Sequence, residues 1–337
     1  MRALAEVRPL LDVHSLSVEF GPAGAPARAV NDVSYSLSRG ETLGIVGESG
    51  SGKSVHLLAM LGLIPCPPAR ITSGSVMFDG TDLLRATDRE LTHIRGRRIG
   101  YVFQDPLTSL NPVLSIGDQM TEGLRRHLRL RRAAAERRAA ELLDLVGISE
   151  PALRLWQYPH EMSGGMRQRV MIAIAIACEP ELLIADEPTT ALDVTVQAQI
   201  VELIKEIRKT IGLSIIWVSH DLAVIAGIAD TVQVMYGGRI LERGPVDDVF
   251  YDPRNAYTLG LLQSLPKGEA AEKRRLTQIE GSPADPSALP AGDPFAPRNP
   301  YATPRCLELM PPLRQVREGA PGHLVATWYD LKAARNN

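Results

Sequence analysis

Cysteine is scarce in this chain. Three cysteines, Cys66, Cys178 and Cys306, are scattered over 337 residues. An odd and scattered set predicts no disulfide framework and is typical of a reducing compartment. Long apolar runs are lacking as well. The longest, VMIAIAIAC, covers residues 170–178, less than half of the roughly 20 residues that a membrane-spanning helix needs. We therefore expect a protein that is not integral to a membrane and that acts on one only through a partner.

The N-terminus lacks the features of a signal peptide, and the chain lacks a basic charge excess. Glu6, Arg8 and Pro9 interrupt the apolar stretch that a signal peptide would need. The formal net charge is -2, whereas a protein that binds nucleic acid normally has a basic face. An arginine-rich segment, residues 125–138, is expected to be a solvated helical face. Nucleic acid is therefore not expected among the partners.

Short apolar strands alternate with helical segments along most of the chain, which predicts an α/β fold with a parallel sheet covered on both faces. After Pro266 the composition changes, and nine prolines stand between residues 283 and 312. Each proline lacks an amide donor and fixes its own φ, so an irregular extension is expected there. We predict a main domain at residues 10–265, with a helical subdomain at about 105–175, and a C-terminal extension at 266–337. Strands are expected at residues 10–43, 42–47, 98–104, 181–187 and 213–221, and helices at 52–64, 115–160 and 167–178.

The segment GESGSGKS, residues 47–54, has the spacing of a phosphate-binding loop between an apolar strand and a helix. Glycines in such a loop allow backbone amides to converge on phosphate oxygens, and the following helix points its positive end at them. We expect Lys53 to reach the β- and γ-phosphates of ATP and the Ser54 hydroxyl to ligate Mg²⁺. A chance glycine turn is the alternative, which the strand–loop–helix context disfavours. The predicted nucleotide-binding residues of the loop are Gly47, Ser49, Gly50, Ser51, Gly52, Lys53 and Ser54.

Two adjacent carboxylates end the apolar segment LLIADE, residues 182–187. We expect Asp186 to hold Mg²⁺ and Glu187 to polarise the water that attacks the γ-phosphate. Gln104, which ends YVFQ, is a neutral amide that can contact both the metal ion and this water. His220 ends an apolar segment whose strand is expected beside that of Glu187, so its imidazole can hydrogen-bond the γ-phosphate. A solvated acidic turn and a structural histidine are the alternatives for these residues taken alone.

A second glycine turn, SGGMRQR at residues 163–169, begins another predicted helix. It offers backbone amides, the Ser163 hydroxyl and a positive helix end, but no lysine and no Mg²⁺ ligand. Such a turn can complete a phosphate site without founding one. Two chains arranged head to tail would place Ser163, Gly164 and Gly165 of each over the other's ATP. The alternative is that the two glycines make only the entry turn of the helix.

The segments GESGSGKS, FQDP, SGGMRQR, LLIADEPTTALD and SHD, in this order, resemble the nucleotide-binding subunit of an ABC transporter over roughly residues 10–265. The resemblance implies a P-loop NTPase fold with a RecA-like lobe, an antiparallel β subdomain and a helical subdomain that carries the SGGMRQR turn. It implies that two subunits enclose two ATP molecules. It also implies that Phe20 stacks on adenine, with Tyr35 as a nearby aromatic alternative. Met162 and Met166 depart from the common LSGGQ pattern, but the serine and the glycines that would bind phosphate are kept.

Four longer segments resemble the ATPases of oligopeptide, dipeptide and nickel importers: FQDPLTSLNP, YPHEMSGGMRQRVMIAIAIA, ADEPTTALDVTVQAQI and NAYTLGLLQSLP. This resemblance implies an ATP-hydrolysing subunit, peripheral to the cytoplasmic face of the inner membrane, that drives the import of peptides or peptide-like solutes. Its partners would be a second ATPase subunit, identical or a sister chain, and two transmembrane permease subunits contacted through about residues 105–112. An extracytoplasmic solute-binding protein would be an indirect partner. The sequence does not specify the solute.

Two other functions are weighed against this one. A soluble ABC ATPase that acts on nucleic acid or ribosomes usually inserts a long coiled coil or fuses two ATPase halves, and the sequence shows neither feature. The other alternative is a catalytically dead half-site that only binds nucleotide. The presence of Glu187, Gln104 and His220 argues against it.

The proline-rich tail departs from the resemblance at three of four cysteine positions and keeps only Cys306. Related tails often carry four cysteines, and some bind an iron–sulfur cluster there. The corresponding positions here are Asp293, Asn299, Cys306 and Thr327. Because a 4Fe–4S cluster normally needs four thiolates, we expect no cluster, and we expect the tail to keep only a packing role.

Overall fold

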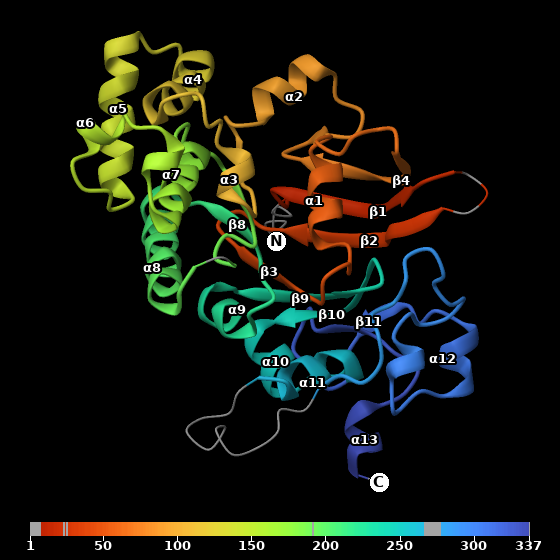
Figure 1. The fold of residues 1–337 in the computed structure, drawn as a ribbon. Helices are drawn as coiled ribbons and strands as arrows, with labels where there is room; N and C mark the ends of the chain where they lie inside the picture. Colours follow the sequence, from red (N-terminus) through yellow and green to blue (C-terminus); the bar gives the residue numbers. More distant parts are fainter. Residues whose placement is uncertain (1–7, 23, 25, 191, 266–277, 337) are drawn as a thin grey trace, which may run out of the picture. The chain divides into compact units, whose positions relative to one another are not determined.

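The computed structural model describes residues 8–22, 24, 26–190, 192–265 and 278–336. The chain forms two compact units, each built from segments that are not contiguous in sequence (Figure 1). The first unit contains the chain up to Leu37, residues Leu43–Leu84 and the chain from His220 onward. The second unit contains Ser38–Thr42 and Arg85–Ser219.

One sheet of the first unit is antiparallel, and its strands follow the order β2 (Ala27–Leu37), β1 (Leu11–Phe20), β4 (Ala69–Phe78) and β5 (Thr81–Asp82). Buried and less buried residues alternate along these strands, as in a sheet with one covered face. In β1 the side chains of Val13, Leu16 and Val18 are completely buried. The sheet confirms the strands that the sequence predicts near the N-terminus.

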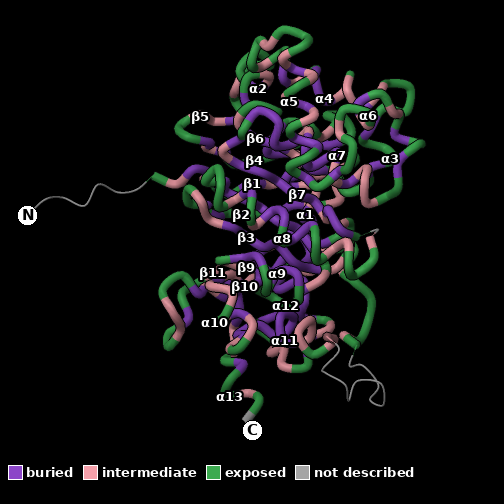
Figure 2. Tube along the Cα trace, turned by 90° about the vertical axis from the view of Figure 1, so that its left-hand side faces the viewer, coloured by how far each residue is buried: buried purple, intermediate pink, exposed green. Residues whose placement is uncertain are grey.

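The other strands of the first unit follow the order β11 (Leu313–Gln315), β12 (Leu324–Ala326), β10 (Arg239–Pro245), β9 (Thr231–Tyr236) and β3 (Thr42–Val46). β3 and β9 are parallel, whereas β10 is antiparallel to both β9 and β12. β3 and nearly all of β9 are buried (Figure 2). In the part of the chain that is described, the α-helices of this unit are α1 (Lys53–Met60), α9 (Leu222–Ile228), α10 (Val246–Tyr251), α11 (Ala256–Gln263), α12 (Pro304–Glu308) and α13 (Leu331–Asn336).

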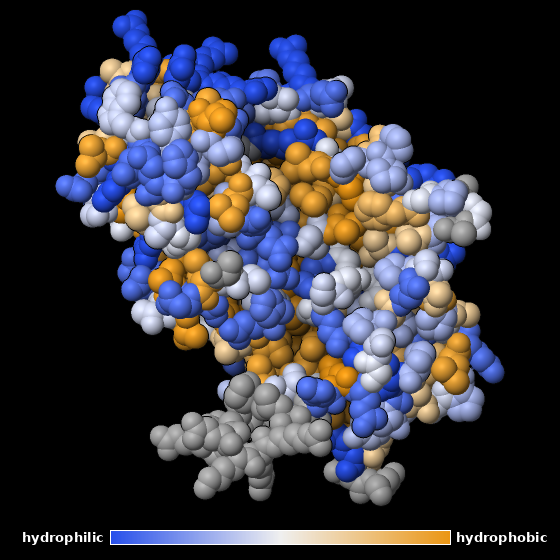
Figure 3. Space-filling model, in the orientation of Figure 1, coloured by the Kyte–Doolittle hydropathy of each residue, from blue (hydrophilic) through white to orange (hydrophobic). Residues whose placement is uncertain are grey.

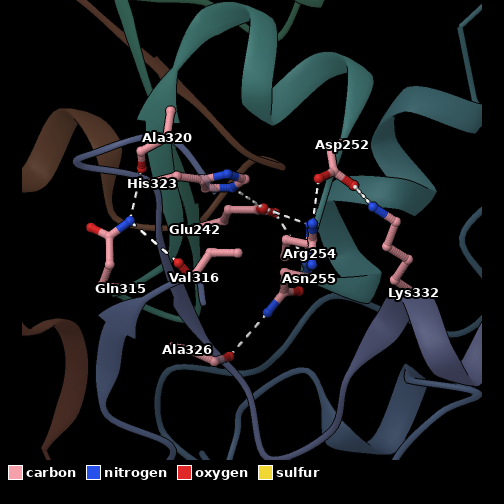
Figure 4. A network of polar contacts seen from close by, with 10 residues as sticks. All are labelled: Glu242, Asp252, Arg254, Asn255, Gln315, Val316, Ala320, His323, Ala326 and Lys332. Carbon is pink, nitrogen blue, oxygen red and sulfur yellow. Dashed lines mark hydrogen bonds and ion pairs between the residues drawn. The ribbon is translucent and has the colours of Figure 1, made fainter. Parts of the chain in front are cut away.

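The C-terminal extension contacts the rest of the first unit around Glu242 of β10 (Figure 4). This side chain is completely buried, and a buried carboxylate is costly unless it has hydrogen-bond partners. It accepts hydrogen bonds from the backbone amides of Arg254 (2.6 Å) and Asn255 (3.1 Å), and His323 Nε2 lies 2.8 Å from its Oε1. Asn255 Nδ2 in turn donates to the carbonyl oxygen of Ala326 in β12 (3.1 Å). The extension is therefore part of the core of this unit.

The second unit contains a parallel sheet in the order β8 (Ser214–Val218), β7 (Leu182–Asp186) and β6 (Ile99–Val102). β7 and β8 are buried throughout, which fits their continuous apolar sequences and confirms the predicted parallel strands. Thr87 and Ser115 are the N-cap residues of α2 (Asp88–Ile94) and α4 (Ile116–Leu128), and each accepts a hydrogen bond from an amide of the first turn. The α-helices described in this unit are α2 (Asp88–Ile94), α3 (Pro106–Ser109), α4 (Ile116–Leu128), α5 (Arg132–Leu145), α6 (Pro151–Arg154), α7 (Gly164–Ile176) and α8 (Val194–Ile211).

The proline-rich tail is more regular than its sequence predicts. Pro304 begins α12, where the missing amide hydrogen has no partner to lose. β11 directly follows Pro311 and Pro312, β12 follows Pro321, and both strands extend the sheet of the first unit. The prolines correctly exclude long helices from residues 283–312, but they do not exclude a single helical turn or short strands just beyond them.

Candidate functional site

The loop predicted to bind phosphate, residues 47–54, connects β3 to α1. Gly50 and Gly52 have φ angles of 79° and 96°, in the left-handed region that favours glycine. A Cβ at Gly52 would lie 2.3 Å from the carbonyl oxygen of Ala29, whereas a Cβ at Gly50 would meet no atom within 4 Å. Ser49 and Gly50 are exposed. The loop is therefore closed against the protein on one side and open on the other, as a backbone that receives a ligand must be.

Lys53, the first residue of α1, is 5% exposed, and its Nζ donates to the carbonyl oxygens of Gly47 (2.8 Å) and Glu48 (3.1 Å). Ser51 Oγ is buried and has no hydrogen-bond partner among the described residues. A buried cation, backbone amides at a helix end and a free hydroxyl are the groups that phosphate oxygens need. The residues present thus fit the phosphates of ATP. Ser54, the predicted Mg²⁺ ligand, follows Lys53 in α1.

Of the two aromatic candidates for adenine stacking, Tyr35 is committed to the core. It is 4% exposed, its Oη donates to Met60 Sδ (3.4 Å), and its Oη lies 3.3 Å from His56 Nε2. Burial raises the pKa of Tyr35 and lowers the pKa of His56 to about 4. Phe20 is only half-buried at the end of β1. Phe20 therefore stays the predicted stacking residue.

Asp186 ends β7 and is 4% exposed. Tyr101 of β6 donates a hydrogen bond from its Oη to Asp186 Oδ2 (2.9 Å). Burial and the charge of Asp186 raise the pKa of Tyr101, so the tyrosine keeps the proton that it donates. One carboxylate oxygen is thereby held at the carboxyl edge of the sheet. Sequence reasoning missed Tyr101, because its relevance emerges only once β6 and β7 are known to be paired.

Glu187 directly follows β7 and has a φ of 48°, which is uncommon for a residue with a side chain. Its amide donates to the carbonyl oxygen of Val218 (3.1 Å). Its Oε2 accepts hydrogen bonds from Gln104 Nε2 (3.2 Å) and Thr190 Oγ1 (2.9 Å). Backbone strain of this kind persists only where the surroundings fix it. The structure thus brings together Gln104 and Glu187, as the sequence predicts, and adds Thr190, which sequence reasoning missed.

His220 lies just beyond β8 and is exposed. β8 is paired in parallel with β7, with Val218 opposite Asp186, so the predicted adjacency of the two strands is confirmed. A hydrogen bond from His220 to a γ-phosphate stays a prediction. The same holds for the Mg²⁺ ligand set of Ser54, Gln104 and Asp186, whose members come from different units.

The second glycine turn is the beginning of α7. Ser163 is the N-cap residue, and its Oγ accepts a hydrogen bond from the amide of Met166 (3.3 Å). A Cβ at Gly164 would meet no atom within 4 Å, whereas one at Gly165 would lie 3.2 Å from Val196 Cγ1. The turn is a helix entry with open space over one of its glycines. Its contact with the ATP of a second subunit stays a prediction.

Asp293, Asn299 and Thr327, which replace cysteines, are buried, and so is the remaining Cys306. The amide of Asp293 donates to the carbonyl oxygen of Cys306 (2.8 Å). Asn299 Nδ2 donates to Tyr329 Oη (3.0 Å), and Thr327 Oγ1 accepts from the amide of Tyr329 (3.2 Å). Burial raises the pKa of Asp293 to about 6. This set of donors does not fit a cluster that takes four thiolates, and the absence of a cluster stays an expectation.

Comparisons with known proteins agree with this geometry. The family described as ABC transporter matches residues 30–190, and the family described as Oligopeptide/dipeptide transporter, C-terminal region, matches residues 241–306. The second match begins before residue 266, and the predicted domain boundary there stays a prediction.

Two relatives and a solved structure are similar to this chain over most of its length. The oligopeptide transport ATP-binding protein OppD of Bacillus subtilis is 50% identical over 325 residues, covering 96% of this chain and 90% of the relative. The dipeptide transport ATP-binding protein DppD of Escherichia coli is 47% identical over 310 residues, covering 92% and 94%. The ATP-binding cassette MJ0796, in a dimeric post-hydrolysis state with ADP and Pi, has a TM-score of 0.63 and 28% identity over 70% of this chain and 98% of its own.

The relatives named here are transport proteins, and they give no support to an ATPase that acts on nucleic acid or ribosomes. The fold, the phosphate-binding loop and the parallel strand β7, which ends at Asp186, agree with the family matches. This chain therefore belongs to the ABC transporter family: it is an ATPase with the P-loop fold of that family, in the branch that contains the oligopeptide and dipeptide transport ATP-binding proteins.

Proposed function

We propose that this chain is the ATP-hydrolysing motor subunit of an importer for peptides or peptide-like solutes. The observation that carries the proposal is the Glu187 carboxylate, held by Gln104 and Thr190 at the end of β7. A carboxylate fixed beside a neutral amide is suited to orient a water molecule and to accept its proton. The class of solute follows from the oligopeptide and dipeptide transport proteins to which the chain is similar.

The phosphates of ATP would be held by the amides of residues 47–54 and by Lys53. Ser54, Gln104 and Asp186 would hold Mg²⁺, which when bound neutralises charge on the phosphate oxygens. Tyr101 supports this assignment because its hydrogen bond to Oδ2 orients the Asp186 carboxylate. Lys53 would exchange its two carbonyl contacts for phosphate oxygens, a stronger charge-assisted interaction.

Hydrolysis would depend on three side chains around the terminal phosphate. Glu187 accepts the proton of the attacking water while Gln104 holds both the carboxylate and the water. The imidazole of His220 hydrogen-bonds the γ-phosphate and loses this contact once the phosphate leaves. Because ATP and ADP differ in this group alone, the two nucleotides would favour different arrangements of the subunits.

A second ATPase subunit, identical or a sister chain, would complete the site. Ser163, Gly164 and Gly165 would contact the partner's nucleotide with backbone amides and the serine hydroxyl. The open space over Gly164 and the position of the turn at the beginning of α7 support this role. A dimeric cassette among the similar solved structures supports it as well.

Two permease subunits would be contacted through residues 105–112. Asp105 caps the short helix α3, and its Oδ1 accepts from the amide of Leu107 (2.8 Å). Leu107 is 63% exposed and Val113 is 76% exposed. On the face shown in Figure 3, apolar residues are interspersed with polar ones over α3 and α7. Leu107 lies on this helical turn and Val113 lies just beyond residues 105–112, and exposed apolar side chains of this kind suit a protein contact.

The protein would lie at the cytoplasmic face of the inner membrane, peripheral to it, and an extracytoplasmic binding protein would deliver the solute. In the part of the chain that the structure describes, no helix is both long and apolar enough to cross a membrane. Attachment would then depend on the permease. Purification of the complex, followed by uptake of a labelled dipeptide into vesicles that contain it, tests this assignment, and failure of all peptides to be taken up would contradict it.

The role of Glu187 is tested by Glu187→Gln. We expect ATP to bind with unchanged affinity, turnover to fall by about 10³-fold or more because the proton acceptor is lost, and a dimer to accumulate with ATP. The measurements are nucleotide binding, phosphate release and light scattering of the purified chain.

A matched control is Glu179→Gln. Glu179 is also a glutamate in the left-handed region, with a φ of 52°, but it pairs with Arg138 at the surface (2.9 Å). Its variant should keep full turnover. Normal turnover of the Glu187→Gln chain would refute the assignment of Glu187.

A further inference from the structure

Glu48, the second residue of the phosphate-binding loop, is held by a residue of the C-terminal extension. Arg298 Nη1 donates to Glu48 Oε2 (2.6 Å), and Arg298 Nη2 donates to Glu48 Oε1 (3.1 Å). The Arg298 side chain is 7% exposed and that of Glu48 is 24% exposed. Two parallel hydrogen bonds between a guanidinium and a carboxylate fix both groups in orientation as well as in distance.

The guanidinium of Arg298 is saturated with acceptors. In addition to Glu48, it donates from Nη1 to Tyr236 Oη (3.1 Å), from Nη2 to the carbonyl oxygen of Ile279 (3.2 Å) and from Nε to that of Glu280 (2.8 Å). Burial opposes its charge, but the hydrogen bonds to Glu48 and Tyr236 outweigh burial and raise the pKa of Arg298. A side chain with every donor used is a rigid anchor.

The backbone of Glu48 is fixed as firmly as its side chain. Its amide donates to Tyr257 Oη (2.8 Å). The Tyr257 ring packs against Tyr236 and Phe295, with centroid distances of 4.7 Å and 5.1 Å. All three rings are almost completely buried. The aromatic cluster of Tyr236, Tyr257 and Phe295 thus joins β9, α11 and the extension directly beneath one end of the loop.

The contacts of Glu48 have two expected effects on the binding of a polyphosphate. A loop whose amides are already oriented loses less conformational entropy when the ligand binds, so it binds more tightly. The negative charge of Glu48 would also repel phosphate oxygens, and Arg298 neutralises it at close range. Both effects act before any nucleotide arrives.

We propose that Arg298 is a positioning residue of the nucleotide site and that the C-terminal extension is thereby part of the phosphate-binding apparatus. The proposal rests on the proposed role of residues 47–54 in binding ATP. Arg298 acts through Glu48 and the loop backbone rather than by touching the nucleotide. The extension then has a function in nucleotide binding beyond the packing role that its sequence predicts.

The test is Arg298→Ala, studied in the full chain with a fluorescent ATP analogue and with steady-state turnover. We expect the Kd for ATP and for ADP to rise about tenfold, which corresponds to roughly 1.4 kcal/mol. The KM for ATP should rise by a similar factor, while kcat at saturating ATP stays within about twofold. Arg298→Lys keeps the charge but not the paired hydrogen bonds, so it should restore only part of the affinity.

A Glu48→Ala chain shows whether Arg298 affects the Kd for nucleotide through Glu48. Because Arg298 acts through Glu48, adding Arg298→Ala to a Glu48→Ala chain should change the Kd by less than twofold, since the two effects are not additive. An equal loss of affinity in both backgrounds would overturn the proposal. If Arg298→Ala fails to fold, the Lys variant carries the test, and an unchanged Kd for it would also overturn the proposal.

Arg254→Ala is the matched control. Arg254 is another buried arginine of the first unit, 10% exposed at its side chain, and it pairs with Asp252 (Figure 4). Its loss should lower Tm and leave the Kd unchanged. If the unaltered chain binds no nucleotide, the proposed function fails; if it binds and Arg298→Ala binds equally well, only the present inference fails.

Discussion

The two glycine turns of this chain are alike in sequence but are held in different ways. The turn at residues 47–52 is fixed from outside, by the backbone that presses on Gly52 and by the residues of distant segments that bind Glu48. The turn at residues 163–165 is fixed from within, by the Ser163 hydroxyl on an amide of its own helix. The first turn is bonded through Glu48 to buried residues, and the second begins a helix at the surface.

This difference separates two ways of contributing to a phosphate site. A turn that must bind a triphosphate by itself needs its amides oriented in advance and a lysine beside them. A turn that only adds contacts to a phosphate site needs no more than a helix N-terminus and room for the ligand. The turn at residues 47–52, which we call the anchored turn, is therefore suited to bind the triphosphate by itself. The turn at residues 163–165 is suited to add further contacts to a triphosphate that is already bound. Substitutions in each turn test this distinction.

The largest effect is expected from Gly52→Ala. The added Cβ meets the Ala29 carbonyl oxygen at 2.3 Å in a backbone conformation that alanine rarely adopts. The loop must shift, and we expect nucleotide affinity to fall by about a hundredfold, roughly 2.7 kcal/mol, in a titration of the isolated chain.

The matched change in the other turn is Gly164→Ala, where the Cβ enters open space. Tm and the Kd for ATP of the monomer should stay as they are. Turnover, followed as a function of protein concentration, should fall about tenfold if the open space receives the partner's nucleotide. Equal losses of monomer affinity in both variants would remove the distinction between the turns.

Ser163 allows capping to be separated from nucleotide contact. Ser163→Ala removes the cap of α7 at a cost of about 1 kcal/mol, which should lower Tm by roughly 2–4 °C. Ser163→Asp keeps the cap but puts a negative charge where a partner's phosphates would lie. It should therefore keep Tm while turnover falls, whereas a fully active Asp variant would restrict this turn to its role as a helix entry.

The last prediction concerns the pH dependence of stability and only the turn at residues 47–52. His56 lies in α1 with its Nδ1 3.3 Å from the carbonyl oxygen of Gly52, and burial lowers its pKa from 6.5 to about 4. Between these two values the unfolded chain binds a proton that the folded chain does not. The stability from neutral His56 is thus fully present above pH 6.5 and falls as pH drops toward 4.

Denaturant unfolding of the His56→Gln chain measures this contribution. Between pH 7 and pH 5 its free energy of unfolding should fall by roughly 2 kcal/mol less than that of the unaltered chain. Parallel pH profiles would contradict the assignment. Gly164→Ala, whose turn contains no buried histidine, should follow the unaltered chain.

The sequence predicts the parts of the site that are local. The phosphate-binding loop is a strand, a turn and a helix within a short segment, so its pattern is sufficient. Gln104 and Glu187 both follow buried strands, and because the carboxyl ends of parallel strands share one edge, their meeting can be expected.

The parts that the sequence does not predict depend on tertiary contacts. Tyr101 becomes meaningful only through the pairing of β6 with β7, and the left-handed backbone of Glu187 has no signature in its residue type. Arg298 and Glu48 are 250 residues apart, so no spacing rule connects them. The prolines of the tail predict an irregular segment where α12 forms, although the first turn of a helix accepts proline.

The first unit is assembled from both ends of the polypeptide, and this has a consequence for synthesis. Translation produces the phosphate-binding loop well before Arg298 and the strands β11 and β12. A product truncated before them would contain the intact glycine-rich motif and yet lack the residues that shape it. A nascent chain would thus acquire the contact that holds Glu48 only after 250 further residues have been added.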